Sequence, residues 1–244
     1  MSAADSRPLA GRVVLVAGAH GGYGSQVSLA CARAGAALVL LGRRVPRLNR
    51  INDQVLAEGG EAWLYPFDLE GASPADHFEL AQRIEDGPGR LDGLVHCAAG
   101  FPGLTPLEHT DPAAVARDLH VNLTARIWMT RACLPLLKRA EDAAVVFLVD
   151  DTGPETVAYR GGYGIAQHGI EALVRTLHAE TAGSPLRVCG LRPRPMRTPL
   201  RARMIAAEGD RQAVDPASQA RACVELLGPA GADWRGRIRD LRAE

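Results

Sequence analysis

Short apolar runs alternate with longer stretches of helical periodicity along most of this chain. The apolar runs predict strands at 12–17, 37–41, 62–67, 91–97, 144–150 and 187–191, and a short last strand at 236–239. Helices are predicted at 22–34, 46–58, 75–86, 112–139, 161–182 and 214–227. Strands that are apolar throughout are covered on both faces, and their alternation with helices indicates a parallel sheet. We therefore expect an α/β fold: a doubly wound parallel sheet of about seven strands with helices on both faces.

The length and composition favour one domain. A chain of 244 residues that is 47% hydrophobic can bury one large core, so we expect a single domain over 1–244. Residues 1–8 are polar and are expected to form a flexible tail. The stretch 192–213 is rich in Arg, Pro and Met and has no clear period, which is typical of a substrate-side flap.

Charge and cysteine usage exclude several classes of partner. The 28 basic and 28 acidic residues give a net charge of +0 without a basic run, so no nucleic-acid or anionic-membrane partner is expected. No apolar run approaches the ~20 residues that span a bilayer, and no signal peptide is visible. The five cysteines are scattered and outside any metal-ligand spacing, which predicts a cytoplasmic protein with reduced thiols and no metal.

A glycine-rich loop joins the first predicted strand to the first helix. It reads Gly18-x-x-x-Gly22-x-Gly24, and a second apolar strand follows the helix. Glycines permit a tight turn and let backbone N–H groups approach a pyrophosphate at the positive end of the helix. We interpret the loop as a dinucleotide site; the alternative is a glycine-rich turn without a ligand.

Together with the strand order and Tyr163 at the start of a late helix, this spacing resembles the short-chain dehydrogenase/reductase family, over nearly the whole chain. The runs 40–44, 133–137, 186–188 and 197–198 resemble its YciK-like bacterial oxidoreductases. The resemblance implies a Rossmann-like fold. It also implies cofactor contacts at Gly18, His20, Gly22, Tyr23, Gly24, Arg43, Arg44, Asp68, Leu69, Ala98, Ala99, Gly100 and Thr198.

Three of these cofactor positions differ in how closely they match the family. Asp68 fits the adenine contact of the family, although a strand-end cap is the alternative interpretation. Ala98-Ala99-Gly100 resembles the Asn-Asn-Ala-Gly turn of the family, but His96 and Cys97 replace the asparagines and one residue is inserted. Thr198 fits the position that grips the nicotinamide side.

The end of the second strand distinguishes between cofactors. An NAD site usually places an acid there for the ribose hydroxyls, whereas this chain has Leu41-Gly42 followed by Arg43-Arg44. A guanidinium binds a 2′-phosphate through charge-assisted hydrogen bonds, and His20 could add to this contact. The sequence therefore favours NADP(H) over NAD(H), the alternative being that both arginines are solvated.

The resemblance also locates an active site, and here the chain departs from the family. Tyr163 and Asn122 match the catalytic Tyr and Asn, but Gln167 stands at the lysine position and Asp150 at the serine position. Gln167 shares a helix face with Tyr163 but has no charge to stabilise a tyrosinate. Asp150 disfavours a second negative charge, and its carboxylate cannot donate to a carbonyl oxygen. All these effects oppose ordinary carbonyl reduction.

Compensation for the missing lysine is restricted. Lys138, the one lysine, lies sixteen residues after Asn122 on the same predicted helix, or ~24 Å away. Arg160, Arg192 or Arg194 could supply charge but no proton. A protonated Asp150 in a dry pocket would instead donate a hydrogen bond or a proton.

Three functions remain open. The first is an NADP(H)-dependent carbonyl/alcohol oxidoreductase with an Asp-Tyr-Gln site and weak or altered activity on a small-molecule substrate. The second is an inactive dinucleotide-binding protein with a sensing or partner-subunit role, and the third is a non-redox enzyme that uses Tyr163 and Asp150. The intact glycine loop argues against the third. The apolar positions of helix 161–182, among them Ile165 and Ile170, exceed what one packed face requires and predict a homodimer or homotetramer.

Overall fold

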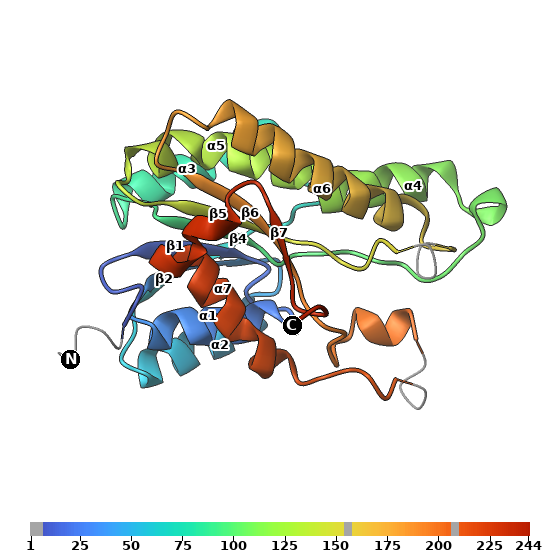
Figure 1. The fold of residues 1–244 in the computed structure, drawn as a ribbon, viewed down its shortest axis with the longest axis horizontal. Coiled ribbons are helices and arrows are strands. Elements are labelled where there is room, and N and C mark those ends of the chain that lie inside the picture. Colours follow the sequence, from blue (N-terminus) through green and yellow to red (C-terminus); the bar gives the residue numbers. More distant parts are fainter. Residues whose placement is uncertain (1–6, 154–157, 206–209) are drawn as a thin grey trace.

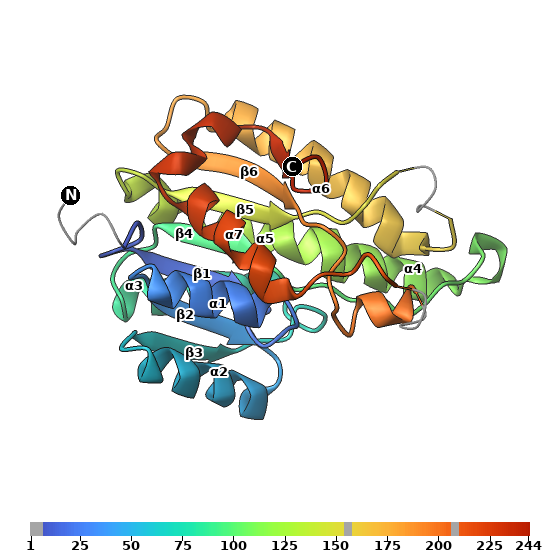
Figure 2. The same ribbon diagram turned by 60° about the horizontal axis from the view of Figure 1, so that its bottom comes forward.

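All strands of the molecule join in one parallel sheet. A computed structural model describes residues 7–153, 158–205 and 210–244. Within these ranges the sheet has the order β3-β2-β1-β4-β5-β6-β7, and every neighbouring pair is parallel (Figure 2). The strands are β1 Val13–Ala17, β2 Ala37–Gly42, β3 Ala62–Pro66, β4 Gly93–His96, β5 Ala144–Leu148, β6 Arg187–Arg192 and β7 Ile238–Asp240.

Burial along the strands follows their position in the sheet. The central strand β1 is buried over its whole length, with Val14 paired to Leu38 of β2 and Leu15 to Leu94 of β4. The edge strands β3 and β7 are mostly half-buried, because each has a neighbour on one side only. Aromatic residues in β3 and charged residues in β7 tolerate this partial exposure.

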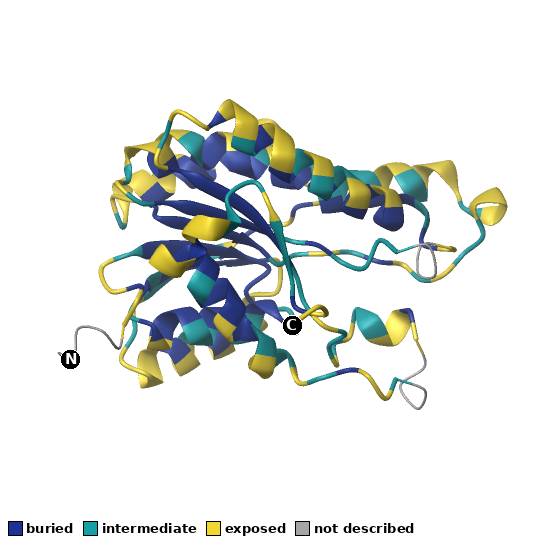
Figure 3. Ribbon diagram, in the orientation of Figure 1, coloured by how far each residue is buried: buried dark blue, intermediate teal, exposed yellow. Residues whose placement is uncertain are grey.

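Helices cover both faces of the sheet. Figure 1 shows α1, α2 and α7 on one face and α3, α5 and α6 on the other, with α4 continuing beyond the sheet. In Figure 3 the sheet and the helix sides turned toward it are buried, and the outer helix sides are exposed. The helices are α1 Gly24–Arg33, α2 Val45–Ala57, α3 Pro74–Asp86, α4 Pro112–Leu119, α5 Ala125–Arg139, α6 Gly161–Glu180 and α7 Ala220–Leu227.

Each sheet face has its own hydrophobic core. Val27, Leu48 and Cys223 belong to the core beneath α1, α2 and α7, and each is fully buried. Met129 and Ile170 belong to the core on the opposite face and are also fully buried. Burying a side chain of this kind stabilises the fold by about 1.5–3 kcal/mol. These two layers confirm the predicted doubly wound α/β fold.

The structure differs from the predicted elements at three places. Residues 112–139 form α4 and α5 joined by a π-helical turn, His120–Thr124, because Asn122 bonds back to the loop after β4 and widens the helix. The predicted helix 214–227 becomes a 3₁₀ turn, Pro216–Gln219, capped by Asp215, and α7 begins only at Ala220. The last strand starts at Ile238 and not at 236.

The expected tail and flap are described in part. Residues 1–6 lie outside the described residues, whereas Leu9 is fully buried and therefore belongs to the core. In the flap, the backbone of Arg197 donates to Val214 and that of Val214 to Pro195, so the two ends of the segment pair. Residues 206–209 of the flap also lie outside the described residues.

Candidate active site

The predicted site residues gather at the carboxyl ends of the strands. The loops after β1, β4, β5 and β6 all leave this edge of the sheet, and the strand order reverses between β1 and β4. Ligands of open α/β sheets bind at such a switch point. The topology thus brings the glycine loop, the 98–100 turn and the Tyr163 region to one edge.

Close backbone contacts explain the three glycines. Gly18 has φ 85°, and a Cβ there would lie 2.6 Å from the Ala98 nitrogen. A Cβ at Gly24 would lie 2.2 Å from the Gly18 oxygen, and one at Gly22 would lie 3.0 Å from Cγ2 of Thr198. The loop therefore contacts both the 98–100 turn and the base of the flap. The free N-terminus of α1 follows directly and can receive an anion.

The Tyr23 side chain points from the glycine loop toward the start of α7. Its hydroxyl donates to the Gln219 carbonyl at 2.9 Å and lies 3.6 Å from the Cys223 sulfur. Burial raises the Tyr23 pKa well above its usual value, and the neighbouring Cys223 raises it further. The Tyr23 side chain thus contacts α7 and the turn before it, and the predicted cofactor contact of Tyr23 would be made by its backbone.

Four arginines surround an open hollow beside the glycine loop. The hollow is lined by Arg43, Arg44, Arg47 and Arg50 with Val45 and Pro46. Arg43 and Arg44 have no ion-pair partner within the described ranges, so their guanidinium groups are available to a phosphate. Arg47 and Arg50 were missed from the sequence, although their spacing of three residues makes them neighbours on the surface of α2, directly after Arg44.

His20 lies against the same arginine group. A Cβ on Gly42 would lie 2.0 Å from its Nδ1, which is buried without a hydrogen-bond partner. Burial lowers the His20 pKa, and the charges of Arg47, Arg44 and Arg43 lower it further. His20 is therefore a neutral residue that fills the space at the end of β2.

Asp68 lies in a second hollow beside Arg43 and Arg44. This hollow is lined by Arg43, Arg44, Pro66, Phe67 and Asp68. The Asp68 carboxylate accepts the Glu70 backbone N–H at 3.2 Å, which corresponds to the strand-end cap considered from the sequence. Leu69 beside it is buried.

Asn122 holds the 98–100 turn in place. Its Oδ1 accepts the Gly100 N–H at 2.9 Å, and its Nδ2 donates to the Gly100 carbonyl at 2.8 Å and to the Asp118 carbonyl at 2.9 Å. These bonds occupy both amide hydrogens of Asn122. The structure thus places Asn122 beside Ala98, Ala99 and Gly100, at the π-helical turn.

Arg126 is a buried cation that the sequence reasoning missed. It is 2% exposed, and its guanidinium donates to the Ala98 carbonyl at 2.7 Å and to the Leu148 carbonyl at 3.0 Å. It therefore links the ends of β4 and β5. Burial lowers the Arg126 pKa to about 10. The sequence contains one indication of this role, because an arginine four residues after Asn122 shares its helix face and stands among apolar positions.

Tyr163 and Asp150 are directly hydrogen-bonded. The Tyr163 hydroxyl donates to Oδ2 of Asp150 at 2.9 Å, and Arg160 Nη1 lies 3.3 Å from the same oxygen. Tyr163 is 2% exposed. Burial raises the Tyr163 pKa well above 10, the charge and hydrogen bond of Asp150 raise it further, and Arg126 and Arg160 oppose this rise. The structure thus brings together the tyrosine and the acid that stands at the family's serine position.

Gln167 lies one helical turn after Tyr163 and is also buried. Its Oε1 accepts the Asp150 backbone N–H at 3.0 Å. The carbonyl end of the amide is therefore used to hold the loop after β5 and is not free for a cofactor. No charge enters the site from this position.

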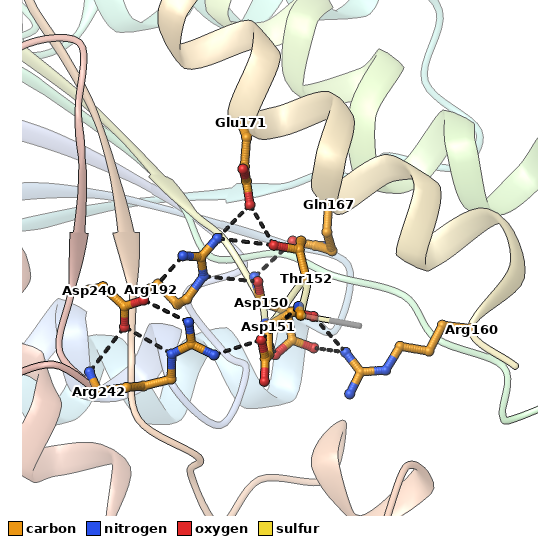
Figure 4. A network of polar contacts seen from close by, with 10 residues as sticks. Asp150, Asp151, Thr152, Arg160, Gln167, Glu171, Arg192, Asp240 and Arg242 are labelled. Atoms are coloured by element: carbon orange, nitrogen blue, oxygen red, sulfur yellow. Dashed lines mark hydrogen bonds and ion pairs between the residues drawn. The ribbon is translucent and has the colours of Figure 1, made fainter. Parts of the chain in front are cut away.

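An ion-pair network fixes the loop that carries Asp150 (Figure 4). Arg192 pairs with Glu171 and, at 3.1 Å, with Asp240, and its Nε donates to the Asp150 carbonyl at 3.4 Å. Arg242 forms a further ion pair with Asp151 at 2.6 Å, and the Thr152 hydroxyl donates a hydrogen bond to Glu171 at 2.7 Å. Of the three arginines considered from the sequence, Arg160 reaches the carboxylate and Arg192 the backbone. The third, Arg194, donates to the Leu241 carbonyl.

Apolar side chains cover Tyr163. The Phe101 ring lies 5.2 Å from the Tyr163 ring, and Met204 and Leu200 of the flap pack on the same cluster. Arg203 donates to the Phe101 carbonyl at 2.8 Å and thereby ties the flap to the loop after β4. The predicted flap thus lies over the candidate site.

The described residues contain no cluster of His, Cys, Asp or Glu that could hold a metal ion. Among them, no helix has the length and apolar character to cross a membrane.

Known proteins resemble the chain over most of its length. The family described as short chain dehydrogenase matches residues 12–209. The oxidoreductase YciK of Escherichia coli K12 is 30% identical over 219 residues, which cover 89% of this chain and 86% of YciK. A short chain dehydrogenase structure from Pseudomonas syringae is 35% identical, with a TM-score of 0.91 and coverage of 96% and 95%. One from Shigella flexneri 2a, complexed with NADP, is 28% identical, with a TM-score of 0.92 and coverage of 97% and 99%.

Proposed function

Because this chain belongs to the short-chain dehydrogenase/reductase family, we propose that it is an NADP(H)-dependent oxidoreductase acting between an alcohol and a carbonyl. Its proton chemistry is carried by Tyr163 and Asp150 in place of the usual Ser-Tyr-Lys set. One observation carries this proposal: the Tyr163 hydroxyl donates to the Asp150 carboxylate at 2.9 Å. This pair keeps a proton-transfer group at the site although the lysine and the serine are both absent.

The cofactor assignment rests on the arginine-lined hollow. Arg43 and Arg44 follow a strand whose end carries no acid, and a 2′-phosphate would receive charge-assisted hydrogen bonds there. The glycine loop with Ala98 and Thr198 would hold the rest of the dinucleotide. The similar proteins from Shigella flexneri and Escherichia coli CFT073 were crystallised with NADP and NADPH respectively, which supports the choice of NADP(H) over NAD(H).

The residues present predict weak carbonyl reduction. A ketone needs a hydrogen-bond donor at its oxygen, but the Tyr163 proton is directed at Asp150. Gln167 brings no positive charge, and the high Tyr163 pKa shows how strongly the surroundings disfavour a tyrosinate. We therefore propose altered activity and not the ordinary reductase mechanism.

A protein that binds the dinucleotide without catalysis is the second candidate, because other side chains cover Tyr163. Phe101 and Met204 leave the ring 2% exposed, so a substrate must displace the flap before it reaches the hydroxyl. A protein with a sensing or partner-subunit role would need the dinucleotide groove but would not need substrate access to the Tyr163 hydroxyl. The non-redox alternative gains no support, because the glycine loop retains the close contacts that a dinucleotide site requires.

Cofactor titration followed by a turnover screen separates these functions. Binding of NADPH with micromolar affinity and turnover of any alcohol or carbonyl supports the oxidoreductase. Binding without turnover supports the sensing role. Absence of NADPH binding would contradict both and leave the non-redox alternative.

We also propose a homo-oligomer in the cytoplasm. Ile165 on α6 is 53% exposed and Ile127 on α5 is 38% exposed, which suits burial against a second copy. All five cysteines are free, and four of them are buried, as suits a reducing compartment.

A further inference from the structure

The partner of Tyr163 is a proton acceptor that reaches the surface. We propose that Tyr163 and Asp150 form a proton relay in which Asp150 is the terminal base, and that the site oxidises an apolar secondary alcohol with NADP⁺. This inference rests on the proposed function and adds the direction of the reaction, the path of the proton and the class of substrate.

The direction of one hydrogen bond defines the relay. Tyr163 donates to Oδ2 of Asp150, so its own lone pairs face away from the carboxylate and can accept a proton. A neutral tyrosine can therefore receive a proton on one side while it releases its own on the other. Such a relay needs no tyrosinate and hence no lysine.

Arg160 contacts the carboxylate of Asp150, the proposed proton acceptor. Its guanidinium lies 3.3 Å from Oδ2 of Asp150, and it also donates to the Asp151 carbonyl at 3.0 Å. Arg160 and Tyr163 thus contact the same carboxylate oxygen, so Arg160 holds this oxygen beside the phenol. In the proposed relay Asp150 accepts the proton during alcohol oxidation and would return it during carbonyl reduction. The charged groups around the pair are Arg160, Arg126, Arg192, Asp151, Glu171 and Arg242.

The path to solvent runs through Asp150. Tyr163 is 2% exposed, whereas the side chain of Asp150 is 30% exposed. Gln167, at the lysine position of the family, offers no second path for the proton along α6. It is buried, and its carbonyl oxygen accepts the Asp150 N–H. Asp150 is therefore the link between the buried phenol and water.

The proton and hydride steps balance. The carbinol carbon loses a hydride to NADP⁺, and its C–O bond becomes a carbonyl. The hydroxyl proton passes to the Tyr163 oxygen while the phenolic proton of Tyr163 passes to Asp150. Asp150 then releases one proton to water, so the products are a ketone, NADPH and H⁺.

The lining of the site indicates the substrate. Phe101, Met204 and Leu200 form one apolar cluster with Tyr163. A substrate that displaces this cover gains most if its carbinol carries apolar substituents. We therefore expect 1-phenylethanol or 2-octanol to be better probes than charged hydroxy acids.

Oxidation of these two alcohols by NADP⁺ tests the relay directly. We expect Asp150→Ala to lower the wild-type rate about 10²–10⁴-fold, the usual range for a lost general base. Formate should restore part of this rate, because Arg160 remains to bind an anion in the vacated place. Formate should not rescue Tyr163→Phe, which lacks the first link, and Asp86→Ala, an exposed acid at the end of α3, should behave as wild type.

Two results of these activity assays would overturn the relay. One is an Asp150→Ala variant that is folded and binds NADP⁺ but keeps more than a tenth of the rate or gains nothing from formate. The other is a wild-type protein that binds NADP⁺ yet oxidises neither alcohol. Failure to bind NADP⁺ would instead contradict the proposed function.

Tyrosine NMR gives a readout that needs neither cofactor nor turnover. The ¹³Cζ signal of Tyr163, assigned with Tyr163→Phe, reports ionisation of its hydroxyl. We expect Asp150→Asn and Asp150→Ala to titrate at lower pH than the wild type, because both remove the negative charge that the phenol faces. An unchanged titration in both variants would show that Asp150 does not accept from Tyr163 and would overturn the relay.

Discussion

At the scale of single residues, we propose that two arginines decide which dinucleotide fits. Arg43 and Arg44 line the hollow beside the glycine loop and have no ion-pair partner in the described part of the chain. We predict that Arg43→Asp weakens NADPH binding by about 1.5–3 kcal/mol and leaves NADH binding nearly unchanged, because a charge-assisted contact with the 2′-phosphate is lost.

Fluorescence titration of both cofactors measures this difference. Arg175→Asp, an exposed charge reversal on α6, is the matched control and should bind NADPH as the wild type does. Equal affinities of the wild type for NADPH and NADH would contradict the assignment.

A repaired active site tests the residues at the serine and lysine positions. We predict that Asp150→Ser with Gln167→Lys raises ketone reduction by about 10²–10⁴-fold, because the serine donates to the carbonyl and the lysine stabilises the tyrosinate. Each single change should do much less, since these groups act together.

The structure predicts that the repaired double variant is less stable than the wild type. Gln167 accepts the Asp150 backbone N–H, and a lysine cannot, so the double variant should lose about 1–3 kcal/mol of unfolding free energy. Urea unfolding measures this loss alongside NADPH oxidation with a ketone panel. A folded double variant that binds NADPH but reduces none of the ketones would show that the pocket itself, and not these two residues, prevents reduction.

At the scale of elements, α3 and α5 pack around a histidine without a hydrogen bond. His77 is fully buried between Phe67, at 4.9 Å, and Trp128, at 6.0 Å, and neither ring nitrogen has a partner. Burial lowers the His77 pKa to about 4 from 6.5. The folded protein therefore resists protonation at a pH where the unfolded chain accepts it.

The sign of this effect follows from linkage. Stability from neutral His77 is complete above pH ~6.5 and is lost as the pH falls toward 4, by about 3 kcal/mol over that range. Urea unfolding between pH 7 and pH 4 should show a shallower decline for His77→Leu than for the wild type. His109→Leu, a change in a largely exposed histidine, should follow the wild-type curve, and identical curves for all three proteins would refute the prediction.

Sequence periodicity located nearly every element, because buried strands and amphipathic helices have patterns of their own. It could not show the π-helical turn at Asn122, because the hydrogen bonds of Asn122 to Gly100 join distant parts of the chain and leave no mark in the apolar pattern. It also could not show that Asp150 faces Tyr163, or that Arg126 links two strand ends. These contacts join residues far apart in the chain, and only the packing of β4, β5 and α6 brings them together.

At the scale of the whole molecule, α5 and α6 leave apolar side chains on the surface. Ile127 and Ile165 remain exposed, whereas Ile170 and Val174 of α6 are buried in the core. We predict that wild-type protein elutes as a dimer or tetramer in light-scattering chromatography and that Ile127→Glu with Ile165→Glu shifts it toward the monomer.

The two introduced glutamates would disfavour an apolar interface between subunits, and both positions lie outside the two hydrophobic cores. The variant should therefore keep its wild-type circular dichroism spectrum. A monomeric wild-type protein would contradict the homo-oligomer, and an unchanged oligomer in the variant would place the interface elsewhere.

The contact between His20 and Gly42 restricts how cofactor choice could change over generations. An acid at position 42 would suit NAD(H), but its Cβ would lie 2.0 Å from the His20 ring, so the ring must first be replaced by a smaller side chain. Of the two possible orders of substitution, we expect His20→Ser before Gly42→Asp to avoid this contact, and we expect the reverse order to pass through a strained variant. Comparing the melting temperatures of the two single variants, and NADH affinity in the double variant, would show whether this lineage has one open route toward NAD(H) or two.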